Sequence, residues 1–281
     1  MPIGLGASLG IGGGRCSTSS GALGGEALTN DLAYPNGLFT KSNFTLSVQP
    51  VMHFDAYDMD GDNSGSVGWS DDDKITTGAG NIWVDRSQRD GTYDASQGDV
   101  VNQATYKVSG SDKYVDFDGA ANYLELATSI SKASGAAWTI VNVAKTDSPS
   151  SSVFAWAPGI ETSGSFQLGK WTNNTVYGAG LGGGALGTSQ DYTSLDMFLV
   201  EKNASNLANN FTSGNNSQGT YTTTSTYTFD SIGKASSSAY HNGEYREILL
   251  FASALSTDDK NVLRLFFASK YGSLPTLAEW T

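Results

Sequence analysis

Oxygen-bearing side chains recur at every second position in one short acidic stretch, Asp58-Met59-Asp60-Gly61-Asp62-Asn63-Ser64. Calcium takes roughly six to eight oxygen ligands, and a loop with this spacing can curl several oxygens onto one ion. The stretch departs from an EF-hand, because Asn63 stands where the loop glycine belongs and Trp69 stands where the bidentate glutamate belongs. Two interpretations stay open, an acidic turn or a Ca²⁺ site formed by Asp58, Asp60, Asp62 and Ser64.

Three aromatic residues lie in or beside predicted loops and are candidates for a ligand site: Trp156, Trp171 and Tyr177. Aromatic rings have a large apolar face, which can stack on the face of a sugar ring. The alternative interpretation places these rings in the core or at its rim.

No familiar catalytic set is found along the chain. The two histidines are His53 and His241, and His241 falls in a predicted hairpin turn whose Asn242-Gly243 pair would take positive φ. Glu244 and Glu247 stand three positions apart on a predicted strand, so their side chains are expected on opposite faces. No Ser-His-Asp, zinc-binding or phosphate-loop pattern is present. The sequence therefore predicts that the chain is not an enzyme.

The net charge of −12 is concentrated in one part of the chain. Residues 51–125 contain 15 acidic and 5 basic residues, a local charge of −10. This argues against nucleic-acid binding, which needs a basic surface, and it permits cation binding. The single cysteine, Cys16, excludes an internal disulfide.

Residues 1–43 form a predicted N-terminal arm in which 9 of the first 25 residues are glycine. Two interpretations compete, a disordered tail and an extended arm that orders against a partner. Regular apolar positions favour the arm: Ile3, Leu5, Leu9 and Ile11. The start of the chain lacks a basic segment followed by an apolar core, so no signal peptide is expected. No apolar run approaches the roughly 20 residues of a membrane span, so membrane insertion is not expected either.

From Phe44 onward, short runs alternate apolar and polar residues, as half-buried strands do. The best of these runs is residues 138–144, and others include 51–55, 82–85, 105–108 and 114–118. Clusters of Gly, Asn, Asp and Ser separate the runs, a spacing typical of a sandwich or jelly roll. One helix is expected after the N-cap Ser256, with Asp258 and Asp259 in its first turn and Gly272 as its stop.

Two blocks of sequence resemble a known family. The closing block runs from Tyr240 through Ile248-Leu249-Leu250-Phe251 into the helix and Lys270-Tyr271-Gly272. The second contains Phe54-Asp55-Ala56, Ile82-Trp83-Val84-Asp85-Arg86-Ser87, Lys113-Tyr114-Val115-Asp116-Phe117-Asp118-Gly119 and Asn122-Tyr123-Leu124-Glu125-Leu126. Together they resemble concanavalin A-like and laminin-G-like jelly rolls over residues 51–273. The resemblance implies an all-β sandwich closed by one short helix, here over residues 44–281. Glucanases of this fold use an E-x-D-x-E strand, which this chain lacks.

The glycine-rich arm and the sandwich together are similar to structural proteins of tailed bacteriophages. The leading hypothesis is a non-enzymatic virion protein, either a capsid decoration, a head fibre or a tail component. The arm would anchor to other virion proteins, and the exposed sandwich could bind host surface glycans. Such a protein is made in the host cytoplasm and located in the virion, and a homo-oligomer is compatible with this. Two alternatives stay open, a carbohydrate-binding module unconnected to a virion and a glycan hydrolase with an unrecognised site.

Overall fold

The structure is a computed structural model that describes residues 32–33, 44–62, 65–87, 91–147, 167–170, 176–179, 184–185, 193–205, 207–212, 217–222, 226–236, 239–272 and 274. Short strands dominate these residues, and one helix follows the last strand. The strands are β1 (Leu32–Ala33), β2 (Phe44–Thr45), β3 (Pro50–Asp55), β4 (Ala95–Ser96), β5 (Thr105–Ser109), β6 (Asp112–Asp118), β7 (Leu124–Lys132), β8 (Trp138–Thr146), β9 (Gln167–Lys170), β10 (Val176–Ala179), β11 (Gly184–Ala185), β12 (Asp196–Lys202), β13 (Leu207–Thr212), β14 (Ser217–Thr222), β15 (Tyr227–Ile232), β16 (Lys234–Ser236), β17 (Ala239–Tyr240) and β18 (Asn242–Phe251).

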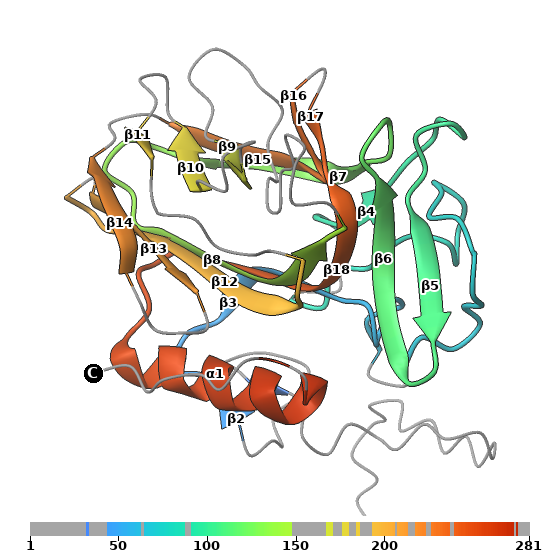
Figure 1. The fold of residues 1–281 in the computed structure, drawn as a ribbon, viewed down its shortest axis with the longest axis horizontal. Helices are drawn as coiled ribbons and strands as arrows, with labels where there is room; N and C mark the ends of the chain where they lie inside the picture. Colours follow the sequence, from blue (N-terminus) through green and yellow to red (C-terminus); the bar gives the residue numbers. More distant parts are fainter. Residues whose placement is uncertain are drawn as a thin grey trace, which may run out of the picture.

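The largest sheet has the strand order β14-β13-β12-β8-β18-β6-β5, and β3 also pairs with β18. Strand β18 therefore lies at the centre of this sheet. One of its edges pairs with β8, while β6 and β3 follow one another along the other edge. A second sheet, β15-β7-β4, lies over one face of the large sheet, and α1 lies under the opposite face (Figure 1).

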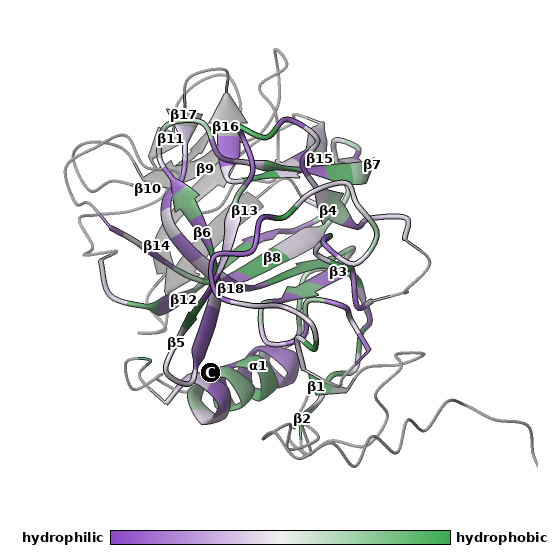
Figure 2. Cartoon of the chain, turned by 90° about the vertical axis from the view of Figure 1, so that its right-hand side faces the viewer, coloured by the Kyte–Doolittle hydropathy of each residue, from purple (hydrophilic) through white to green (hydrophobic). Residues whose placement is uncertain are grey.

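The core between the two sheets is apolar and rich in aromatic side chains. Trp138 of β8 lies edge-on to Tyr227 and Phe229 of β15, with ring centroids 5.0 and 5.7 Å apart. The alternation of apolar and polar residues predicted strands with one covered face, because successive side chains of a strand point to opposite sides of a sheet. Strand β8 is buried on both faces, since nearly all of its residues are buried. Figure 2 shows green, apolar stretches on strands in the middle of the molecule, and it shows both apolar and polar residues on α1. The all-β sandwich expected from the sequence is confirmed.

Helix α1 (Thr257–Tyr271) is capped as the sequence predicts. Ser256 accepts a hydrogen bond from the Asp259 backbone N–H, and Gly272 ends the helix in the left-handed region with φ of 53°. Its apolar side packs with the helix-facing side of the large sheet, including Leu249 and Phe251 of β18. The single short C-terminal helix is therefore also confirmed. Among the described residues, the structure contains no helix long and apolar enough to cross a membrane.

Two local predictions are wrong. Asn242 and Gly243 do not form a hairpin turn; they begin β18 and pair with Asp118 and Phe117 of β6. Gly243 has φ of 142°, and a Cβ there would lie 2.3 Å from the Lys145 carbonyl oxygen, so glycine is required by the close approach of β8.

Residues 82–85 do not form a strand and contribute only an isolated bridge between Trp83 and Ala95. The predicted arm, residues 1–43, falls outside the described residues except for Leu32–Ala33, so its boundary stays a prediction.

Candidate functional site: an acidic loop and an aromatic cluster

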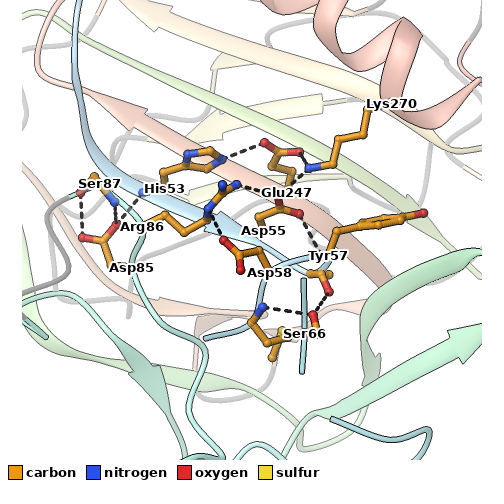
Figure 3. A network of polar contacts seen from close by, with 12 residues as sticks. His53, Asp55, Tyr57, Asp58, Ser66, Asp85, Arg86, Ser87, Glu247 and Lys270 are labelled. Atoms are coloured by element: carbon orange, nitrogen blue, oxygen red, sulfur yellow. Dashed lines mark hydrogen bonds and ion pairs between the residues drawn. The ribbon is translucent and has the colours of Figure 1, made fainter. Parts of the chain in front are cut away.

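A buried polar network is built where β3 ends beneath α1. Met52 and Phe54 of β3 enter the inner core, so the alternating residues His53 and Asp55 face the helix. Asp55 accepts hydrogen bonds from Arg86 at 2.7 Å and from the Lys270 ammonium group at 2.6 Å (Figure 3). All of these groups are buried or nearly so, which means that they depend on one another for charge compensation.

Glu247 of β18 completes the network. Its carboxylate accepts hydrogen bonds from Lys270 and from the Tyr271 hydroxyl, both at 2.7 Å, and contacts His53 Nε2 at 2.8 Å. His53, Asp55 and Glu247 therefore converge closely enough to suggest a metal site. The Lys270 ammonium already bridges both carboxylates, so the geometry supports a structural tie between α1 and the sheet. Burial and the neighbouring Glu247 raise the pKa of Tyr271 well above its ordinary value, which keeps its hydroxyl protonated.

The predicted acidic loop is attached to this network through Asp58. Arg86 Nε lies 2.8 Å from Asp58 Oδ2, and the same guanidinium holds Asp55, so the loop begins at a fixed position. Ser66 closes the loop: its hydroxyl accepts from Met59 N–H and donates to the Ala56 carbonyl (Figure 3).

The structure brings Asp58, Asp60 and Asp62 together, with one carboxylate oxygen of each within 4.8 Å of the others. Asp58 is buried, Asp60 is partly exposed and Asp62 is exposed. Burial, a hydrogen bond with Asp58 and the charges of the neighbouring carboxylates raise the pKa of Asp60 to about 7. A hard cation with oxygen ligands would relieve this repulsion, and the donor set fits calcium. Arg86 offsets part of the negative charge, which favours a weak site.

For the other four predicted site residues, the assignment stays a prediction. Ser64, Trp156 and Trp171 lie outside the described residues. Tyr177 belongs to β10, where its backbone pairs with Gly169 and Ala185.

Sequence reasoning missed an aromatic cluster at the β16–β17 ladder. Lys234 and Tyr240 are directly opposed in this ladder, and Tyr123 approaches from the segment that precedes β7. The Lys234 ammonium lies 4.0 Å from the centroid of the Tyr123 ring and 5.7 Å from that of Tyr240. The two tyrosine rings are 6.3 Å apart and tilted by 44°. All three side chains are partly exposed, so the cluster is accessible.

The backbone around this cluster is fixed by turns and glycines. Gly119 donates to the His241 carbonyl and His241 donates to the Gly233 carbonyl, each at 2.8 Å, which joins the three segments. The Asp118 carboxylate accepts from three successive N–H groups, those of Ala120, Ala121 and Asn122. These backbone bonds help to keep the Asp118 pKa low, although burial acts in the opposite direction. The backbone that carries the aromatic cluster is therefore held by hydrogen bonds.

A signal for this cluster was present in the sequence. Leu124 and Leu126 are buried and Glu125 is exposed, so Tyr123 stands at a position where the alternation calls for a polar residue. Its hydroxyl donates to Glu125 at 3.3 Å. An aromatic residue at a strand position where the pattern predicts a solvent-facing polar residue is a candidate ligand contact, and Tyr123 could have been identified in this way.

The expectation that Glu244 and Glu247 point to opposite faces is wrong. The register of β18 against β8 shifts between Tyr245 and Glu247, so one extra residue enters the strand there. Arg246 binds Glu244 through Nε at 3.0 Å and also lies over the Tyr271 ring, whose hydroxyl binds Glu247. The Glu244 and Glu247 carboxylates therefore both lie on the side of the large sheet that faces α1.

No family model and no curated protein sequence matches this chain. Among solved structures, it is similar to a Trypanosoma rangeli sialidase in complex with the inhibitor DANA, with 12% identity and a TM-score of 0.49 over 79% of this chain. It is also similar to domain 4 of a GH43 extracellular arabinanase from Geobacillus stearothermophilus in complex with arabinotriose, with 10% identity and a TM-score of 0.45 over 76% of this chain and 98% of that domain. A third match is botulinum neurotoxin type C, described as dependent on two ganglioside molecules for cell entry, with 14% identity and a TM-score of 0.42 over 68% of this chain and 50% of the other.

This chain spans about a third of the length of the sialidase, 33%. The prediction that the chain is not an enzyme is corrected, because the matched structures include sialidases and a domain of an arabinanase. At these identities the likeness concerns the fold and assigns no activity.

Proposed function

We propose that this chain is a glycan-binding β-sandwich, and the observation that supports it is the cluster of Tyr123, Lys234 and Tyr240. Two partly exposed tyrosine rings lie close together, and the ammonium group over the Tyr123 ring supplies donors for sugar hydroxyls. A small number of polar groups beside aromatic surface is the usual composition of a small-ligand site. Since backbone hydrogen bonds hold the segments that carry the cluster, little backbone entropy is lost on binding.

A glycan array with the full chain, followed by titration calorimetry on the positives, tests this proposal. Tyr123→Ala and Tyr240→Ala should each weaken binding roughly tenfold, because each removes a stacking surface. Tyr114→Ala is the matched control, since Tyr114 is a partly exposed tyrosine on β6 outside the cluster. Unchanged affinity in both cluster variants, or silence across a broad array, would count decisively against glycan binding.

A second proposal concerns the acidic loop, which we expect to bind calcium weakly through Asp58, Asp60 and Asp62. A calcium titration followed by thermal unfolding should raise the Tm of the wild type. Asp60→Asn and Asp62→Asn should abolish the rise, whereas Asp72→Asn, at an exposed acid of another loop, should leave it intact.

Calcium binding should also depend on pH. Because burial raises the pKa of Asp60 to about 7, calcium must displace a proton below that pH, so the calcium affinity should fall as the pH drops from 8 to 6. A calcium-induced rise in Tm that does not depend on pH, or that is equal in all variants, would contradict the proposed site.

The virion role stays a separate proposal that rests on the sequence, with residues 1–43 as the anchor to other virion proteins. No comparison supports it. Deleting residues 1–43 should abolish co-sedimentation with phage particles while circular dichroism remains that of a folded sandwich. Equal occupancy of the shortened chain on particles would refute anchoring by the arm.

A further inference from the structure

Two exposed valines lie beside the aromatic cluster. Val100 is 73% exposed and Val101 is 68% exposed, and they are among the few large apolar side chains that the described residues present to solvent. Adjacent exposed valines cost solubility without contributing to the core, so their placement suggests a contact with something apolar.

The loop that carries these valines is fixed. Asp99 accepts from Val101 N–H at 3.2 Å through its side chain and from Asn102 N–H at 2.9 Å through its carbonyl. Its own N–H donates to the Gln97 side chain at 2.9 Å, and Gln103 donates to the Gln97 carbonyl at 3.2 Å. Because both ends of the turn are bonded in this way, the valines cannot readily fold back onto the protein.

The same loop is hydrogen-bonded to the segment that carries Tyr123. Tyr123 N–H donates to the Asn102 carbonyl at 3.0 Å, and the Asn122 side chain donates to the Val101 carbonyl at 3.5 Å. Gln97 in turn donates to the Tyr123 carbonyl at 3.4 Å. The loop that carries the valine pair and the segment that carries Tyr123 are therefore joined side by side.

The charge of this surface opposes acidic ligands. Glu125 and Asp99 are exposed on it, and Lys234 is the nearby base. Glu125 also accepts from the Tyr123 hydroxyl, so a carboxylate borders the ring on which a sugar would stack. Repulsion between this carboxylate and an anionic sugar disfavours uronic, sulfated and sialylated glycans.

We infer that this surface selects uncharged glycans that carry a methyl-bearing acetamido group, with the valine pair contacting the methyl group and the tyrosines the sugar rings. The inference rests on the proposed glycan binding and specifies its ligand class. Removing a methyl group from water against an apolar surface strengthens binding about fourfold. Chitotriose should therefore bind at least about fourfold more tightly than cellotriose, which has hydroxyls in place of the acetamido groups.

Calorimetric titration of the full chain with chitotriose, cellotriose and trigalacturonic acid tests the inference. The double variant Val100→Ser/Val101→Ser should lose the preference for chitotriose and keep the affinity for cellotriose. Val67→Ser is the matched control, because Val67 is 67% exposed in another loop, and it should behave as the wild type. Trigalacturonic acid should bind most weakly.

The outcomes separate the two proposals. If Tyr123→Ala removes binding but the valine variant keeps the chitotriose preference, the inference is wrong and glycan binding stands. If Tyr123→Ala leaves every affinity unchanged, the binding surface itself is wrong. Tighter binding of trigalacturonic acid than of chitotriose would also overturn the inference. Thermal unfolding of each variant shows whether a lost signal reflects a lost fold.

Discussion

Asp116 of β6 lies opposite Glu244 of β18, so two acidic side chains oppose each other across neighbouring strands. Burial raises the pKa of Asp116 to about 6, and the negative charges of Asp147, Glu244 and Asp118 add to the effect. In the unfolded chain the same carboxyl titrates near its ordinary value of about 3.9. The folded state therefore holds this proton more tightly than the unfolded state between those two pH values.

This difference predicts how Asp116→Asn changes stability with pH. Above pH 6 the wild type carries a carboxylate that the fold disfavours, so the variant should be the more stable protein. Below about pH 4 the carboxyl is protonated in both states, and the difference should vanish. Thermal unfolding from pH 4 to 8 measures it. Asp258→Asn, on the exposed first turn of α1, is the control. If the stability difference between Asp116→Asn and the wild type were the same at every pH, the raised pKa would not belong to Asp116.

Gly243 allows a second test at the level of single residues. A Cβ at this position would lie 2.3 Å from the Lys145 carbonyl, whereas at Gly110, which has φ of 64°, a Cβ would meet nothing within 4 Å. Gly110→Ala should cost about 1 kcal/mol from backbone strain alone. Gly243→Ala should cost about 3 kcal/mol or more, because β8 must also shift. Urea unfolding of both variants gives the two values, and equal costs would show that the close approach of β8 is unimportant.

At the scale of elements, α1 is attached to the sandwich at both ends. Near its start the Asp259 carboxylate accepts from the Ser47 N–H and hydroxyl, both at 2.6 Å, so the helix is joined to the segment after β2. Near its end Lys270 bridges Asp55 of β3 and Glu247 of β18. Between these points, the apolar side of the helix covers the sheet. The ion pairs of Lys270 with Asp55 and Glu247 thus hold the C-terminal end of α1 at one position on the sheet.

Lys270→Met should destabilise the fold by about 3–5 kcal/mol, because it leaves two buried carboxylates short of one positive charge. Adding Glu247→Gln in the same chain should recover part of that loss, since one of those charges is then removed. Urea unfolding measures both. Lys74→Met, at an exposed lysine in another part of the chain, is the control. A loss below 1 kcal/mol in Lys270→Met would show that the bridge is not a stabilising tie.

The features that could be predicted from the sequence depend on residues that are close together in the chain. The caps of α1 and the apolar run of β8 depend on residues close together in the chain, so pattern and propensity sufficed. The convergence of Asp58, Asp60 and Asp62 was likewise readable from their spacing. By contrast, Lys234 meets Tyr123 through backbone bonds between distant segments, and the shift at Tyr245 depends on the partner strand. No nearby sequence pattern encodes contacts of that kind.

At the scale of the whole molecule, the acidic stretch 51–125 has a structural use as well as a solubilising one. The Asp71 carboxylate accepts from Val108 N–H and the Asp73 carbonyl accepts from Tyr106 N–H, both at 2.8 Å, so this run covers the outer edge of β5. Lys107 of the same strand pairs with Asp72. Charged cover of this kind keeps an outer strand from pairing with another molecule.

The central place of β18 also constrains how the chain acquires its structure during synthesis. Strands β3, β6 and β8 all pair with β18, which follows them by about a hundred residues or more, so the large sheet stays in separate parts until Phe251 has left the ribosome. A chain that ends at Ser236 lacks the strand that joins those parts, and it should remain sensitive to protease. Folding of the large sheet therefore needs many contacts between distant segments, which makes it slow.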